Sequence, residues 1–169
     1  MTETSPIQVL ISEIEKSSQA LQKINDFYQS YALRLPPSPN RTLEQAIVIS
    51  ELLVNYYTCL ETIFLRISQY FENSLSHEKW HQDLLRKMTL DLQGVRERVL
   101  ADETANLLSE LLKFRHFKRY YFDFHYDWDQ LDFLRKKYEQ VLPLVKSDLD
   151  RFMKFLIQLL ANQPQTLEP

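Results

Sequence analysis

Residues 42–72 read TLEQAIVISELLVNYYTCLETIFLRISQYFE and contain the clearest structural pattern of the chain. Thr42 with Gln45 three residues later is typical of a capping box, in which two side chains satisfy free N–H groups at the start of a helix. Apolar residues then recur every three or four positions, as on one face of a helix. They are Leu52, Leu53, Tyr56, Leu60, Ile63, Phe64, Ile67 and Phe71. We therefore expect a long amphipathic helix that ends near Glu72.

Before and after this segment, prolines and polar stretches divide the chain into further helices. Ser5 followed by Pro6 predicts a helix that reaches about Leu33, where a proline-rich loop ends it. The long apolar stripe of this helix suggests that dimer contacts use it. A shorter helix follows the polar connection at 73–77, with Gly94 as its expected C-terminal stop.

The second half of the chain predicts two more helical segments. One starts at Asp102 or Thr104 and runs through an aromatic and basic stretch to about Tyr126. Asp127 then caps a last helix or helix pair, which Pro143 kinks or divides. The acidic residues are scattered along these helices, and we expect them to be solvated surface charges.

Glycine usage narrows the fold class. The 169 residues include one glycine, Gly94, where an average usage of about 7% predicts roughly a dozen. Sheet hairpins and phosphate-binding loops both need glycine, so both are nearly excluded. We expect an all-α bundle of about five helices, two of them long and antiparallel, with no cofactor. Any phosphate contact must then come from side chains.

Charge and hydropathy limit the partners. The net charge of −3 argues against indiscriminate coating of nucleic acid, but not against a local basic site. No uninterrupted apolar run approaches the roughly 18 residues of a membrane span, and no charged-then-apolar leader directs export. The single cysteine, Cys59, fits a reducing compartment. We therefore expect a cytoplasmic protein with no membrane partner.

Cations and aromatic rings concentrate in residues 113–126, KFRHFKRYYFDFHY. This combination holds single-stranded nucleic acid, because cations meet phosphates while rings stack on unpaired bases. Lys113, Lys118 and Tyr121 are the expected RNA-binding residues. Arg115 continues the apolar stripe of its helix, so it must face a partner or a cleft, since an unpaired buried charge is costly. The alternative is an amphipathic helix end whose cations extend over a ring-rich core.

A second pattern, HEKWH at 77–81, matches the H-E-x-x-H zinc signature. Its context argues against a metalloprotease, because His77 falls at the start of a helix after a polar loop and no spacing selects a third ligand. We expect capping and surface roles for His77 and His81, and no bound metal.

Four separated motifs lie at 56–64 (with CLETIF at 59–64), 80–85 (WHQDLL), 111–119 (LLKFRHFKR) and 127–131 (DWDQL). Together, and in this order, they resemble the HepT-like branch of the HEPN superfamily. The resemblance implies a HEPN-type helical bundle that dimerises and acts as a metal-independent ribonuclease toxin. It also implies a partner, a small nucleotidyltransferase antitoxin of the MNT type, which places nucleotide on a tyrosine beside the active site.

The resemblance covers about residues 45–160 and sets the expected domain organisation. A single HepT-like domain would span residues 1–161, before a frayed tail at 162–169. Within it, 1–40 would form the N-terminal helix and proline-rich loop, and 45–160 the HepT-like core.

The family's active motif is an arginine, four to six residues, a histidine and, often two residues later, the modified tyrosine. Arg115 aligns with the arginine, but Tyr120 stands in the histidine position and Phe122 in place of the tyrosine. A shifted pair, Arg119 with His125, satisfies the arginine and histidine spacing, although no tyrosine stands two residues later.

Metal-free RNA cleavage needs a cation at the phosphate, a base and an acid. Arg115 can supply the cation, and His116 or His125 the base, because a histidine pKa of about 6.5 suits proton transfer and a tyrosine pKa of about 10 does not. Tyr120 could act as a hydrogen-bond donor or weak acid.

Two functions stay open. One is a ribonuclease toxin whose homodimer joins two copies of Arg115, Arg119, Tyr120 and His125 or His116. The other is a module that binds RNA or a nucleotidyltransferase without cutting.

Overall fold

The computed structural model describes residues 5–72, 80–120 and 125–162. Within these residues the chain forms five α-helices, a 3₁₀ turn at Ser38–Asn40 and no β-strand, which confirms the all-α prediction. The helices are α1 (Pro6–Ala32), α2 (Leu43–Glu72), α3 (Trp80–Lys87), α4 (Asp102–Tyr120) and α5 (Trp128–Ala161). The expected tail beyond residue 162, like residues 121–124, lies outside the described part of the chain.

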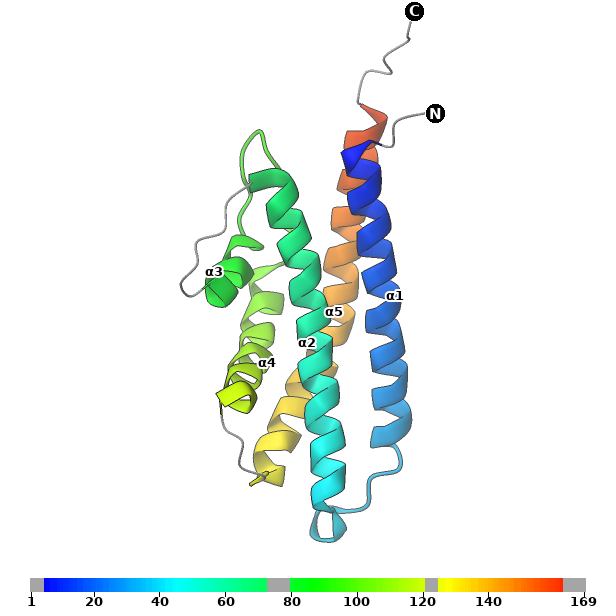
Figure 1. Ribbon diagram of the computed structural model, residues 1–169, viewed down its shortest axis with the longest axis vertical. Coiled ribbons are helices and arrows are strands. Elements are labelled where there is room, and N and C mark those ends of the chain that lie inside the picture. Colours follow the sequence, from blue (N-terminus) through cyan, green and yellow to red (C-terminus); the bar gives the residue numbers. More distant parts are fainter. Residues whose placement is uncertain (1–4, 73–79, 121–124, 163–169) are drawn as a thin grey trace, which may run out of the picture.

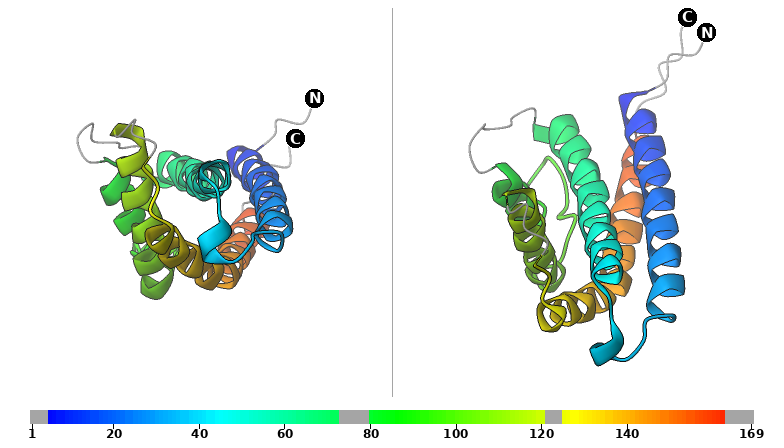
Figure 2. Two further views of the ribbon diagram at one scale, coloured as in Figure 1. Left: turned by 90° about the horizontal axis from the view of Figure 1, so that it is seen from below. Right: turned by 60° about the horizontal axis from the view of Figure 1, so that its bottom comes forward.

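The helices pack around α2. α1 lies beside α2 and runs antiparallel to it (Figure 1). α4 packs against both α2 and α5. The short α3 contacts both α2 and α4. α5 also contacts α1 and α2. In the left view of Figure 2, which is seen from below, α2 lies between α1 and α4, and α5 lies across from α2. Each of the other four helices therefore covers part of α2.

This position explains why α2 is so apolar. By length and composition it contains an 18-residue window that could cross a membrane, although no uninterrupted apolar run predicted one. Half of that window is buried inside the protein. The packing of four helices against α2 accounts for its composition, because a helix covered on several sides needs more than one apolar face.

The helix starts follow the predicted capping signals. The backbone N–H of Gln45 donates to Thr42 Oγ1 at 3.3 Å, and the N–H of Thr42 donates to Gln45 Oε1 at 3.0 Å, so the capping box is confirmed. Asp127 caps α5 by accepting the N–H of Asp129 at 2.9 Å. These local signals locate the starts of α2 and α5.

The apolar stripe of α1 is used within its own chain. Ile7, Leu10, Ile14, Leu21 and Tyr28 are all buried against the rest of the bundle. The suggestion that dimer contacts use this stripe is therefore wrong for these side chains, which are already covered.

Pro143 does not divide the last helix. α5 continues through it from Trp128 to Ala161, and the first part of the helix, drawn in yellow, leans away from the orange remainder (Figure 1). A proline inside a helix removes one hydrogen bond and favours a bend. The many core contacts of the long helix hold both parts together.

Gly94 is not the C-terminal stop of α3, which ends seven residues earlier at Lys87. It lies in a tight turn where Leu92 O accepts the N–H groups of Val95 at 2.9 Å and Arg96 at 3.0 Å. Gly94 has φ +73°, a conformation that other residues rarely adopt. The glycine is therefore needed for this turn between α3 and α4.

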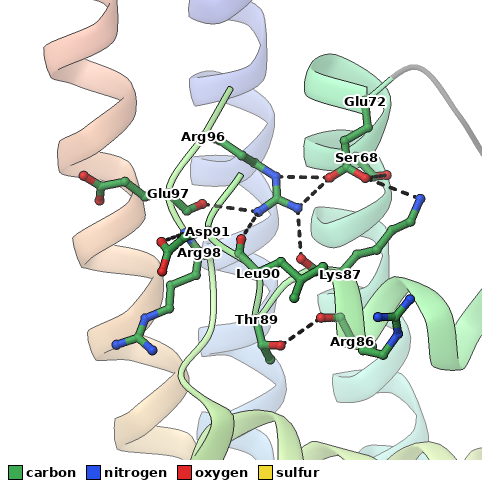
Figure 3. Close-up of polar contacts among 10 residues, drawn as sticks. All are labelled: Ser68, Glu72, Arg86, Lys87, Thr89, Leu90, Asp91, Arg96, Glu97 and Arg98. Carbon is green, nitrogen blue, oxygen red and sulfur yellow. Dashed lines mark hydrogen bonds and ion pairs between the residues drawn. The ribbon is translucent and has the colours of Figure 1, made fainter. Parts of the chain in front are cut away.

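Arg96 anchors the α3–α4 connection to the end of α2 (Figure 3). Its guanidinium donates to Glu72 Oε1 from Nη2 at 2.5 Å and from Nε at 3.1 Å. It also donates to the carbonyl oxygens of Lys87, Leu90 and Glu97. The arginine side chain has no exposed surface, and its hydrogen bonds fix the end of α3 relative to α2.

Asp148 of α5 fixes the start of α4. Its Oδ2 accepts the Thr104 hydroxyl at 2.6 Å and the N–H of Ala101 at 3.0 Å. Arg151 donates to Oδ1 at 3.2 Å. Because Thr104 and Asp148 are buried, this polar contact sets where α4 begins.

Candidate functional site

Three helices meet at the carboxylate of Glu61. This residue lies in the middle of α2, and its side chain is 6% exposed. His81 of α3 places Nδ1 2.5 Å from Glu61 Oε1, and Arg115 of α4 donates from Nη1 to Oε2 at 2.5 Å. Each carboxylate oxygen thus contacts a different side chain from a different helix.

The partners compensate the burial of the glutamate. An ionised carboxylate only accepts hydrogen bonds, so Nδ1 of His81 must carry the proton in this contact. A buried carboxylate without donors would be costly, and the loss of one partner from a buried ion pair leaves an uncompensated charge. We conclude that the expectation of solvated surface charges is wrong for Glu61, as it is for Glu72 and Asp148.

Arg115 has the partner that its position in the sequence required. Its place on the apolar stripe of α4 predicted a partner or a cleft, and Glu61 is that partner. The Arg115 Cζ also lies 5.8 Å from the centre of the Tyr57 ring, one turn before Glu61 on α2. The arginine side chain is 16% exposed, so it is not fully enclosed by the protein.

Tyr57 is a packing partner of Arg115 rather than a base. Its side chain is fully buried, and burial, with a smaller contribution from the charge of Glu61, raises the pKa of Tyr57. The phenol therefore stays protonated at neutral pH. Within the described chain its hydroxyl has no hydrogen-bond partner.

The end of α4 carries the other predicted residues. Lys118 contacts Glu51 of α2 at 2.7 Å, and Lys113 contacts Glu110 at 2.8 Å. Both expected RNA-binding lysines are thus paired with carboxylates. His116 and Arg119 are exposed on α4.

His125 returns to the same end of the bundle. It is exposed, and it lines a small crevice with Lys118, Phe114 and Tyr126. Tyr120 is the last residue of α4, but its side chain lies outside the described part of the structure, as does all of Tyr121. The structure brings Lys118 and His125 together, and it places Arg115 one turn before Arg119 on the same helix.

Glu61 and His81 were not among the predicted site residues. His81 was expected at the surface or in a capping role, yet it contacts the buried carboxylate of Glu61. A signal for Glu61 was present, because it lies on the helical face of Tyr57 and Phe64, both fully buried. A carboxylate on such a face must find donors. No comparable signal in the sequence selects His81.

Of the two histidines in the zinc signature, the structure describes His81. His81 directs Nδ1 to Glu61, while His77 and Glu78 lie outside the described residues. Among the residues that the structure describes, no three His, Cys, Asp or Glu side chains are grouped as a metal site would require.

Comparison with known proteins gives one match. A family model described as "HepT-like protein" matches residues 48–156. The match includes α3, α4 and most of α2 and α5, and therefore Glu61, His81 and Arg115. The N-terminal helix α1 lies before it. No match was found among curated proteins or among solved structures.

Proposed function

The chain belongs to the family of HepT-like proteins, and from this premise we propose that it is the toxin of a toxin–antitoxin pair, a ribonuclease that cleaves single-stranded RNA without a metal ion. The observation that carries the proposal is the position of Arg115. Glu61 pairs with its guanidinium, the arginine side chain is 16% exposed, and the end of the same helix carries Lys118 beside His125. A cation and a histidine at one end of the bundle suit a phosphodiester substrate.

The proposed reaction needs no external reactant other than RNA. The 2′-oxygen attacks phosphorus, and the bond from phosphorus to the 5′-oxygen breaks, which leaves a 2′,3′-cyclic phosphate and a 5′-hydroxyl. His125 accepts the 2′-hydroxyl proton, and Arg115 donates N–H groups to the charged phosphate oxygens. The leaving oxygen takes a proton from an acid, for which His116 and Tyr120 are the candidates in the sequence.

The partners follow from the same family. The toxin acts as a homodimer that joins two copies of the site, and its antitoxin is a small nucleotidyltransferase of the MNT type. Sedimentation of the purified chain tests the first point. Co-purification with a nucleotidyltransferase encoded in a neighbouring reading frame tests the second.

A specific observation also favours a second function, RNA or partner binding without cleavage. The positive charge of Arg115 is opposed by Glu61 at 2.5 Å, and Tyr120 stands in the position where the family motif has histidine. Such a protein would keep the basic end of α4 as a docking site and lack turnover.

A cleavage assay separates the two functions. EDTA-treated protein is incubated with labelled single-stranded RNA, and the ends of the products are identified. The ribonuclease should release 2′,3′-cyclic phosphate ends, and His125→Ala should slow cutting at least tenfold, within the range of about 10²–10⁴ that acid–base groups contribute. Lys146→Ala is the control, because Lys146 is exposed on α5 and pairs with Asp150.

Three results would each contradict a part of this proposal: the cleavage, its independence of metal ions, or the role of His125. Intact RNA together with retained RNA or partner binding would support the binding module instead. Cutting that EDTA abolishes would show a metal requirement. Equal cutting by wild type and His125→Ala would remove His125 from the mechanism.

A further inference from the structure

We propose that His81 is a positioning residue for Arg115. By occupying Glu61 Oε1, it limits the carboxylate to a single contact with the guanidinium and leaves the rest of the arginine fork for an RNA phosphate. The part of this inference that concerns RNA rests on the proposed function. The control of Arg115 by His81 rests on the structure alone.

The contact between Glu61 and Arg115 has an unusual form. Arginine and carboxylate groups frequently pair through two parallel N–H···O bonds. Here Arg115 donates to Oε2 from Nη1, while Oε1 faces His81. Within the described residues, Glu61 Oε2 is the hydrogen-bond acceptor of Arg115. Four of the five N–H bonds of the guanidinium therefore remain for another acceptor.

Burial explains why His81 matters for this geometry. Glu61 is held among buried neighbours on α2, including Leu60 and Phe64. Without His81, Oε1 would have lost its donor in a buried site, and a buried acceptor without a donor is costly. The N–H groups of Arg115 already lie beside the same carboxylate. Glu61 would then take two of them and form the parallel pair, which leaves fewer for a phosphate.

The position of His81 depends on the polar contacts that hold α3 against α2. The ring stands at the start of α3, and Arg96 holds the end of that helix by donating to the carbonyl oxygen of Lys87 at 3.0 Å (Figure 3). Lys87 also contacts Glu72 Oε2 at 3.4 Å. Because Glu72 and Glu61 lie on the same helix, α3 is fixed relative to the carboxylate that His81 contacts.

Three substitutions of His81 separate positioning from packing. His81→Asn places an amide N–H near the position of Nδ1 and should preserve the contact with Glu61. His81→Gln places its amide nearer the position of Nε2, and His81→Leu has no donor. Thermal unfolding of each variant establishes that it is folded. If His81→Leu does not fold, the Asn and Gln variants still make the comparison.

The first measurement uses the free protein. The side-chain ¹⁵N–¹H signals of Arg115 are recorded for the wild type and each variant. We expect them to change in His81→Leu and His81→Gln, because the guanidinium gains a second bond to Glu61, and to stay like wild type in His81→Asn. Unchanged Arg115 signals in His81→Leu or His81→Gln would overturn the proposal.

The second measurement is binding to single-stranded RNA methylated at its 2′-oxygens, which cannot undergo attack by the 2′-oxygen. His81→Leu and His81→Gln should weaken binding about tenfold, on the order of one charge-assisted hydrogen bond, while His81→Asn stays within about threefold of wild type. Equal binding by all variants would overturn the role of His81 at the phosphate. If the wild type binds no RNA but the Arg115 signals change as expected, the proposed function fails and the control of Arg115 by His81 stands.

Discussion

Two glutamates of α2 each pair with an arginine, and the two arginines serve opposite purposes. Glu72 and Arg96 close the end of α2, where all three guanidinium nitrogens of Arg96 donate within the protein and the side chain has no exposed surface. Glu61 lies in the middle of α2 and Arg115 on α4. Within the described residues one nitrogen of Arg115 donates to a carboxylate, and the arginine side chain is 16% exposed. A saturated arginine holds structure, whereas an oriented arginine with unused N–H groups can bind a ligand.

The largest difference between the two pairs should be in stability. Arg96→Ala leaves the carboxylate of Glu72, whose side chain is 11% exposed, with Lys87 as its remaining cation, and it leaves three carbonyl oxygens without their donor. We expect a loss of about 3–5 kcal/mol in the free energy of unfolding, the range for a broken buried ion pair. Arg115→Ala should cost about half as much, because His81 still contacts Glu61 and the arginine is partly exposed. Urea unfolding of both variants makes the measurement, and a larger loss for Arg115→Ala would reverse the assignment.

A third buried carboxylate, Asp148, provides an intermediate case. Thr104→Val keeps the shape of the side chain and removes the hydroxyl that donates to Asp148 at 2.6 Å. The N–H of Ala101 and the side chain of Arg151 still donate to the carboxylate. We expect a loss of about 1–2 kcal/mol in the free energy of unfolding, with RNA binding unchanged. Weaker RNA binding by the folded variant would link the start of α4 to the site.

The smallest effect on stability should come from removing the hydroxyl of Tyr57, whose ring packs against Arg115. Tyr57→Phe keeps the ring and removes a buried hydroxyl that has no partner within the described chain. Because an unpaired buried hydroxyl contributes no hydrogen bond, the variant should equal the wild type in stability or exceed it by up to about 1 kcal/mol. Differential scanning calorimetry is sensitive enough to measure this. A loss above about 1 kcal/mol would reveal a partner of the hydroxyl, such as an ordered water molecule.

The sequence predicts local features well and tertiary partners poorly. Thr42 with Gln45 and Asp127 mark helix starts because their hydrogen bonds join residues a few positions apart. The spacing of Arg115 on its helix predicts that it needs a partner. It does not identify Glu61, which lies 54 residues away and meets Arg115 only when α2 and α4 pack.

His81 and Gly94 show the limits of periodicity in a different way. His81 is partly buried because of where α3 packs. That position depends on Arg96 and on the α3–α4 connection, whose sequence has no helical pattern. Gly94 was expected to end a helix, since both a helix end and a tight turn use a glycine with positive φ. Only the hydrogen bonds of Leu92 distinguish the two cases.

The contrast between the two arginines can be tested in one RNA-cleavage experiment. Arg115→Lys and Arg96→Lys are compared with the wild type in EDTA, with each rate divided by the folded fraction of that variant. Lysine keeps the charge but loses the planar fork. We predict that Arg115→Lys cuts single-stranded RNA at least tenfold more slowly per folded molecule, while Arg96→Lys cuts like wild type. Wild-type cutting by folded Arg115→Lys would contradict the assignment of Arg115 to the phosphate.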